Sequence, residues 1–209
     1  MSKLRARKIK LILFDVDGVL TDGKIWIFPA PGGIERPASS PNTLLERSTQ
    51  KDGQSGFGFQ SATLIEAKGF HAHDGTAISL ARLAGIKTGL ITKRISETVA
   101  LRARDLKIDH VHQGIQNKAA VLEQILEKDG FTSAEVAFVG DDVIDLPVMR
   151  KCGFAIAVKN ARSEVKAEAH YITAHSGGDG AARDAVEFIL KAQGKWKKAV
   201  EDYTEERGG

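Results

Sequence analysis

The sequence of 209 residues lacks the features that mark several special classes of protein. Its one cysteine, Cys152, excludes an internal disulfide and suits a reducing compartment. Its apolar runs are far shorter than the roughly 20 residues of a membrane-spanning helix. Its net charge is only +3, from 30 basic and 27 acidic side chains, which gives no reason to expect a nucleic-acid or membrane partner. We therefore expect a soluble, cytoplasmic protein.

Short apolar runs that end at polar or glycine-rich turns recur along the chain. They are Lys10–Phe14, Lys87–Ile91, Val136–Val139 and Phe154–Val158. Unalternated runs rich in Val and Ile are typical of strands buried on both faces, as in parallel sheets. Apolar residues at helical spacing predict helices in Ala77–Leu83, Ala119–Lys128 and Ala181–Ala192. Alternating strands and helices predict an α/β fold, a three-layer Rossmann-like sandwich with a parallel sheet.

The length suits a single domain over residues 1–209. Residues 29–60 interrupt the alternation, because they hold four of the five prolines and few residues that could build a core. We interpret them as a flexible insertion within a β-hairpin whose arms are Lys24–Phe28 and Ala62–Ala67. The polar segment at about 195–209 is expected to be a loose tail.

The most informative motif is a pair of acids, Asp15 and Asp17, that follows the first buried run and precedes Gly18. Open α/β sheets bind ligands at the carboxyl ends of their strands. Paired carboxylates there can hold a divalent cation, attack phosphorus or move protons. Two solvated acids in an ordinary turn would give the same short pattern, so the motif needs support from elsewhere in the chain.

Other polar groups follow further predicted strands and supply that support. Thr92 follows one strand, and a second acidic cluster with Asp141, Asp142 and Asp145 follows another. Lys118 opens a predicted helix, where a cation and helix N-terminal amides can meet an anion. Acids, a hydroxyl and a lysine at one edge of a sheet suit Mg²⁺-assisted phosphoryl transfer.

These segments resemble the haloacid dehalogenase superfamily and, within it, the small 3-deoxy-D-manno-octulosonate 8-phosphate phosphatases. The resembling segments, in chain order, are Phe14–Gly23, Gly69–Gly75, Gly89–Arg94, Gln113–Lys118, Val139–Met149, Gly177–Arg183 and Ala192–Trp196. The resemblance implies a HAD-like fold without a large cap domain. It also implies a Mg²⁺-dependent phosphatase of lipopolysaccharide biosynthesis and a homotetramer assembled through the β-hairpin.

The resemblance also implies roles for the acids. Asp15 would attack phosphorus and form an aspartyl-phosphate. Asp17 would protonate the leaving alcohol and later activate water. Asp15, the main-chain carbonyl of Asp17 and the carboxylate of Asp141 would bind Mg²⁺. Asp142 and Asp145 would orient the metal shell from outside.

The remaining implied roles concern phosphate and substrate. Thr92 and Lys118 would hold the phosphoryl oxygens, helped by main-chain amides at Asp17, Gly18 and Lys93. Lys93 stands where the family usually has glycine, and His73 stands where it usually has arginine, so the exact substrate is open. His73 is a candidate substrate-pocket residue. Arg183 is another, because this segment approaches a neighbouring subunit's site in the family, although a solvated helix face explains it equally well.

Three functions remain open on the sequence. The first is hydrolysis of 3-deoxy-D-manno-octulosonate 8-phosphate. The second is the same chemistry on a nonulosonate 9-phosphate or another small phosphate ester. The third is a non-catalytic assembly module of the same fold, against which the acids and Lys118 argue.

Overall fold

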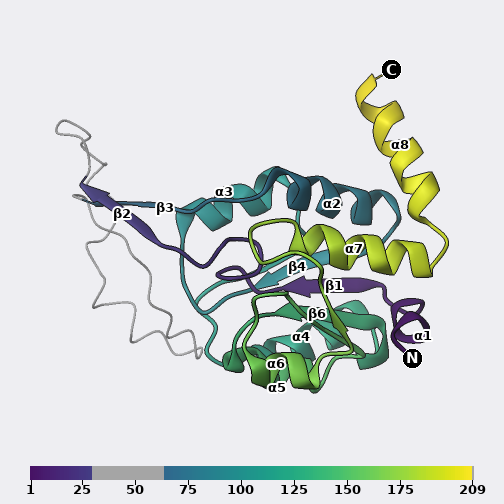
Figure 1. The fold of residues 1–209 in the computed structure, drawn as a ribbon, viewed down its shortest axis with the longest axis horizontal. Helices are drawn as coiled ribbons and strands as arrows, with labels where there is room; N and C mark the ends of the chain where they lie inside the picture. Colours follow the sequence, from purple (N-terminus) through teal and green to yellow (C-terminus); the bar gives the residue numbers. More distant parts are fainter. Residues whose placement is uncertain (30–63, 209) are drawn as a thin grey trace.

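The computed structural model describes residues 1–29 and 64–208 and forms three layers (Figure 1). The middle layer is a six-stranded sheet in the order β5-β4-β1-β6-β7-β8, and every pair in it is parallel. Its strands are β1 (Leu11–Phe14), β4 (Lys87–Ile91), β5 (His110–His112), β6 (Val136–Gly140), β7 (Phe154–Ala157) and β8 (Tyr171–Ile172). The parallel sheet confirms the predicted fold class.

Helices cover both faces of this sheet (Figure 1). One face carries α2 (Ala72–Leu83), α3 (Glu97–Asp105) and α7 (Ala181–Ala192). The other carries α4 (Lys118–Asp129), α5 (Leu146–Met149) and α6 (Ser163–Glu168). The short α1 (Ser2–Ala6) and the single turns Ser133–Glu135 and Val143–Asp145 complete this part of the chain. The three helices predicted from spacing are confirmed as parts of α2, α4 and α7.

The core explains why the strands read as unbroken apolar runs. All four residues of β1 have no exposed surface, because β1 lies between β4 and β6 with helices above and below. Helix α3, the three-residue β5 and the two-residue β8 were not predicted as elements. The strands β5 and β8 lie at the edges of the sheet, where so few residues give no readable apolar pattern.

A two-stranded antiparallel hairpin, β2 (Trp26–Pro29) with β3 (Leu64–Ala67), projects from the carboxyl ends of the parallel strands (Figure 1). It confirms a strand in each predicted arm, although Lys24 and Ile25 of the first arm precede the strand. Residues Ala62 and Thr63 of the second arm and the insertion at 29–60, apart from Pro29, lie outside the described residues. Trp26, Ile27 and Phe28 are each about half exposed in the single chain.

The end of the chain differs from the prediction of a loose tail. Residues Trp196–Gly208 form helix α8, which packs on α2 and α7. Ala199 is buried, and Trp196, Val200 and Tyr203 pack on the core cluster. These apolar residues are few and widely spaced in a polar segment, so the sequence shows no clear helical pattern there. No helix in the described parts of the chain has the length and apolar character needed to cross a membrane.

Candidate active site

The predicted site residues converge because three central strands end side by side. Phe14, the last residue of β1, pairs with Leu90 of β4 and Val139 of β6. The chain then leaves the sheet at Asp15, at Thr92 and at Asp141. Asp15 and Thr92 are buried, with 4% and 2% of their surface exposed. Parallel register therefore brings together residues that lie far apart in the sequence.

Three carboxylates meet at this edge. One oxygen from each of Asp15, Asp141 and Asp145 lies within 4.8 Å of the others. Burial raises the pKa of the Asp15 carboxyl to about 6, although Lys118 opposes this change. Burial, and then the charges of Asp15, Asp145 and Asp142, raise the pKa of Asp141 to about 7. The site thus concentrates more negative charge than its protein surroundings offset.

Lys118 lies behind Asp15. It is the first residue of α4, whose N-cap Asn117 accepts a hydrogen bond from the main-chain N–H of Ala120. Its Nζ lies 2.9 Å from Asp15 Oδ1 and 2.6 Å from Asp145 Oδ1. Burial alone would lower the pKa of this lysine, but the two carboxylates outweigh it and raise the pKa. Lys118 is therefore held as a cation.

Asp145 organises the loop after β6. Its side chain is fully buried. Its Oδ2 accepts hydrogen bonds from the main-chain N–H groups of Asp141 and Asp142, at 3.0 and 3.4 Å. Asp142 itself is exposed and accepts a hydrogen bond from the N–H of Val143. The buried carboxylate of Asp145 thus fixes both the main chain that carries Asp141 and the ammonium of Lys118.

Gly18 allows the first acidic loop to pass directly over Asp141. Its φ of +95° is in the left-handed region, and a Cβ added there would overlap the carboxylate of Asp141. A side chain at this position would therefore be strained by the backbone and would displace one of the three carboxylates.

The carboxylates open into a pocket of about 340 Å³. Its lining residues are Asp15, Asp17, Thr92, Lys93, Arg94, Asp141, Asp142 and Ile144. Lys93 is exposed at the pocket, whereas Lys118 reaches the site only through its contacts with Asp15 and Asp145. The pocket therefore offers acids and cations to one ligand.

Asp17 does not join the carboxylate cluster. Its Oδ1 pairs with the ammonium of Lys68, and its Oδ2 lies 3.8 Å from Nε of Arg94. Lys68, Arg94 and Arg94's partner Glu66 were not predicted as site residues. Arg94 had one available signal, because it directly follows Lys93. Lys68 lies one residue beyond the predicted hairpin arm, where no pattern pointed to the site.

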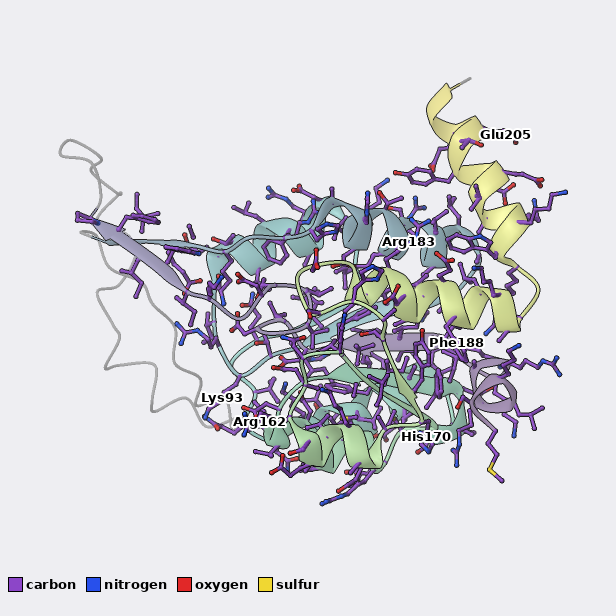
Figure 2. The ribbon with its side chains drawn as sticks, in the orientation of Figure 1. Lys93, Arg162, His170, Arg183, Phe188 and Glu205 are labelled. Carbon is purple, nitrogen blue, oxygen red and sulfur yellow. The ribbon has the colours of Figure 1, made fainter. Side chains whose placement is uncertain are left out.

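Two predicted substrate residues lie away from this pocket. His73 is exposed on α2, and its ring contacts His71. Arg183 on α7 lies 3.3 Å from Glu187 and stacks on the ring of Trp196. Figure 2 shows Arg183 near α8, well apart from Lys93 at the other end of the molecule. The single chain therefore does not bring either residue to the carboxylates.

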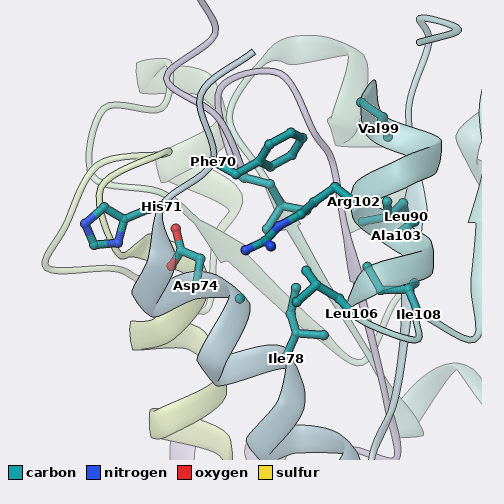
Figure 3. A pocket seen from close by; sticks show the side chains of 12 residues that line it. Phe70, His71, Asp74, Ile78, Leu90, Val99, Arg102, Ala103, Leu106 and Ile108 are labelled. Carbon is teal, nitrogen blue, oxygen red and sulfur yellow. The ribbon is translucent and has the colours of Figure 1, made fainter. Parts of the chain in front are cut away.

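A second cavity lies between α2 and α3 (Figure 3). Arg102 reaches into it beneath Phe70, and a Cβ at Gly75 would overlap the Arg102 guanidinium. The other lining side chains are mostly apolar. The cavity volume is about 10 Å³, roughly the space of one water molecule. This cavity is too small to be the substrate site.

The carboxylate cluster fits a divalent cation. Asp141 Oδ1 is buried and has no hydrogen-bond partner within the described ranges. Mg²⁺ prefers carboxylate and carbonyl oxygens, and a cation here would offset the repulsion that raises the pKa values of Asp15 and Asp141. The residues present therefore suit Mg²⁺, with the carboxylate of Asp17 turned toward Lys68 and Arg94 instead.

Known proteins share this arrangement of sequence and fold. Residues 81–183 match the family described as haloacid dehalogenase-like hydrolase. The chain is 34% identical over 195 residues to the 3-deoxy-D-manno-octulosonate 8-phosphate phosphatase of Escherichia coli strain K12, a match that covers 93% of this chain and 86% of that protein.

Solved structures agree over similar lengths. One is the 3-deoxy-D-manno-octulosonate 8-phosphate phosphatase of Moraxella catarrhalis in complex with a magnesium ion, a phosphate ion and a KDO molecule. It is 31% identical with a TM-score of 0.77, covering 96% of this chain and 97% of that one. The phosphatase of the same description from Yersinia pestis is 30% identical with a TM-score of 0.75, covering 94% and 88%.

Proposed function

The chain belongs to the haloacid dehalogenase-like hydrolases and is a phosphatase of the 3-deoxy-D-manno-octulosonate 8-phosphate phosphatase family, and we propose that this sugar-acid phosphate is its substrate. The observation that carries the proposal is the ion pair between Asp15 and Lys118, which lies beside the carboxylates of Asp141 and Asp145. A lysine held as a cation lets a carboxylate and a phosphate dianion approach each other.

Asp15 is the nucleophile of the proposed reaction. One of its oxygens forms a bond to phosphorus as the bond from phosphorus to the sugar oxygen breaks, and Asp17 donates a proton to that departing oxygen. Water then attacks phosphorus of the aspartyl-phosphate and gives a proton to Asp17. Asp15 and inorganic phosphate are released, so both residues return to their starting states.

The other residues act on charge and orientation. Mg²⁺, held by Asp15, Asp141 and the carbonyl of Asp17, with Asp142 and Asp145 outside, would neutralise charge on the transferring group. Thr92 and Lys118 bind phosphoryl oxygens, and the amides of Gly18 and Lys93 donate hydrogen bonds to them. These roles are supported by the positions of the residues at or beside one pocket.

The cations at the pocket support an acidic substrate. Lys93 and Arg94 both line it, so a sugar with a carboxylate as well as a phosphate gains a second ion pair there. His73 and Arg183 lie outside this pocket. They can contact substrate only in an assembly, where a neighbouring copy would present them.

The family also suggests the cellular setting. We propose a cytoplasmic homotetramer whose hairpins meet at its centre and whose product serves lipopolysaccharide biosynthesis. The exposed Trp26, Ile27 and Phe28 support the assembly, because an isolated two-stranded hairpin is marginal in water and needs its apolar side chains covered.

A phosphate-release screen tests the substrate. The panel contains 3-deoxy-D-manno-octulosonate 8-phosphate, a nonulosonate 9-phosphate and neutral sugar phosphates, each with Mg²⁺ and with excess chelator. We expect the largest kcat/KM for the first compound and no turnover with chelator. A higher kcat/KM for the nonulosonate ester or for neutral sugar phosphates would contradict the proposed substrate. Full activity in chelator would contradict the metal-dependent mechanism.

A further inference from the structure

Lys68 is a buried cation at the end of the hairpin arm, one residue beyond β3. Its side chain has no exposed surface, and its ammonium pairs with Oδ1 of Asp17. Burying an ammonium is costly unless a counter-ion and hydrogen bonds compensate it. A lysine in such a place therefore restrains its partner, because breaking the pair would leave an uncompensated charge inside the protein.

The pair is part of a chain of alternating charges. The other carboxylate oxygen of Asp17 lies 3.8 Å from Nε of Arg94. Arg94 in turn lies 3.4 Å from Oε2 of Glu66, which belongs to β3. Oε1 of Glu66 accepts a 2.6 Å hydrogen bond from the hydroxyl of Ser96, the N-cap of α3. Asp17 is thus held between two cations, one of which, Arg94, is anchored through Glu66 to β3 and to the start of α3.

This restraint sets where the Asp17 carboxylate points. Asp17 lines the same pocket as Asp15 and lies only two residues further along the chain. A free carboxylate at that distance would be attracted to any divalent cation held by Asp15 and Asp141. Lys68 and Arg94 instead attract its two oxygens, one each.

We propose that Lys68 is a positioning residue, which aims the Asp17 carboxyl at the leaving-group oxygen and keeps it from the cation site. The inference rests on the proposed function. Lys68 acts only through Asp17, so its loss impairs proton donation and leaves the attack by Asp15 intact. Proton donation matters for a sugar alkoxide, a poor leaving group, and matters little for p-nitrophenolate, which departs unprotonated.

The experiment compares two substrates in four variants of the full chain. The variants are Lys68→Met, Lys68→Arg, Asp17→Asn and the control Lys87→Met. The control removes an ion pair of 3.0 Å to Asp129 at the opposite end of β4 from Thr92. The value of kcat/KM is measured with Mg²⁺ for the best sugar phosphate of the screen and for p-nitrophenyl phosphate. This ratio reports the steps up to release of the alcohol, so hydrolysis of the aspartyl-phosphate, which also uses Asp17, does not enter the comparison.

For Lys68→Met we expect kcat/KM for the sugar phosphate to fall about 10- to 100-fold, with less than about threefold change for p-nitrophenyl phosphate. Asp17→Asn should show the same selectivity more strongly. Lys68→Arg should recover most of the loss, and Lys87→Met should affect both substrates equally and slightly.

An equal loss on both substrates in Lys68→Met would overturn the inference, as would no loss on either. If the wild-type protein cleaves neither ester, the proposed function itself fails. Each variant's melting temperature is recorded beforehand. If Lys68→Met is not folded, Lys68→Gln decides the question by the same comparison, because it keeps a polar N–H donor without the charge.

Discussion

Three carboxyl groups and one ammonium lie close together, and all of them except the partly exposed Asp141 are buried. Asp145 holds Lys118 and the main chain of Asp141 at once, while Lys118 also holds Asp15. Because burying charge is costly, the protonation state of each group depends on the others. Single substitutions at this site should therefore change the charge balance as well as remove a reacting atom.

Asp15→Asn should abolish turnover and leave the fold intact. An amide cannot form the phosphoryl-enzyme, so kcat should fall by several orders of magnitude, about 10⁴-fold or more. Phosphate release with Mg²⁺ measures the loss, and circular dichroism checks the fold. Turnover within about tenfold of the wild-type rate would exclude Asp15 as the nucleophile.

Asp141→Asn should stabilise the metal-free protein at neutral pH. A carboxyl whose pKa rises on folding, here from 3.8 to about 7, binds its proton more tightly in the folded state. Wild-type stability is therefore lost as pH rises through that interval, and the variant escapes this loss. In the presence of chelator, Asp141→Asn should have a higher melting temperature than the wild-type protein. The difference should be largest above pH 7 and should decrease toward pH 4.

The neighbouring exposed residue gives the control for this prediction. Asp142→Asn removes the same charge one position away and should show a much smaller gain. Added Mg²⁺ should raise the melting temperature of the wild-type protein and of Asp142→Asn, but hardly that of Asp141→Asn. The same melting temperature for wild type and Asp141→Asn at pH 7.5 would contradict the prediction.

The sequence allowed much of this site to be predicted, because chemistry at a strand end follows from chain order. Asp15, Thr92 and Asp141 each directly follow a readable apolar run, so their convergence needs only parallel pairing. Lys68 and Glu66 could not be found this way. They lie in or directly after a hairpin outside the main sheet. No local sequence pattern indicates that the end of this hairpin contacts Asp17.

At the scale of elements, a helix or strand could be predicted only where its apolar residues form a clear pattern in the sequence. The four-residue β1 and the twelve-residue α7 carry clear apolar patterns, and both are present as expected. Helix α8 was mistaken for a loose tail because its apolar residues are few and its surface is charged. Its packing depends on tertiary contacts with α2 and α7, which a local pattern does not contain.

Ala199→Asp should detach α8 from the body of the protein. Ala199 is only 2% exposed, and burying an unpaired carboxylate costs several kcal/mol, so the helix should leave its place. We expect a lower melting temperature and faster proteolysis after residue 195. Thr204→Asp adds the same charge at an exposed position of α8 and should change neither. Equal behaviour of the two variants would show that α8 contributes no stability.

At the scale of the whole molecule, the hairpin is the feature that a single chain does not explain. Its β2 strand presents Trp26, Ile27 and Phe28 to solvent. It projects from the carboxyl ends of the parallel strands (Figure 1), where Asp15 follows β1 and Asp141 follows β6. Assembly through it would cover these side chains and bring neighbouring copies toward the pocket.

We expect light scattering at micromolar concentration to give the mass of about four chains. Phe28→Glu should dissociate the assembly, because it places a charge in the surface to be buried. Leu101→Glu changes an equally exposed residue on α3, outside the hairpin, and should leave the mass unchanged. A wild-type monomer would contradict the assembly and leave each pocket without a neighbour.

The central place of β1 has a consequence for synthesis of the chain. Leu11 pairs with Lys87 on one side and with Val136 on the other. At about 5–20 residues per second, a ribosome makes the second partner roughly 6–25 s after β1 itself. During the first part of that interval β1 has no partner strand, and after residue 91 it can pair only with β4, so its other edge stays uncovered. An exposed apolar strand edge favours aggregation, so we expect synonymous codons before residue 136 to influence the soluble yield.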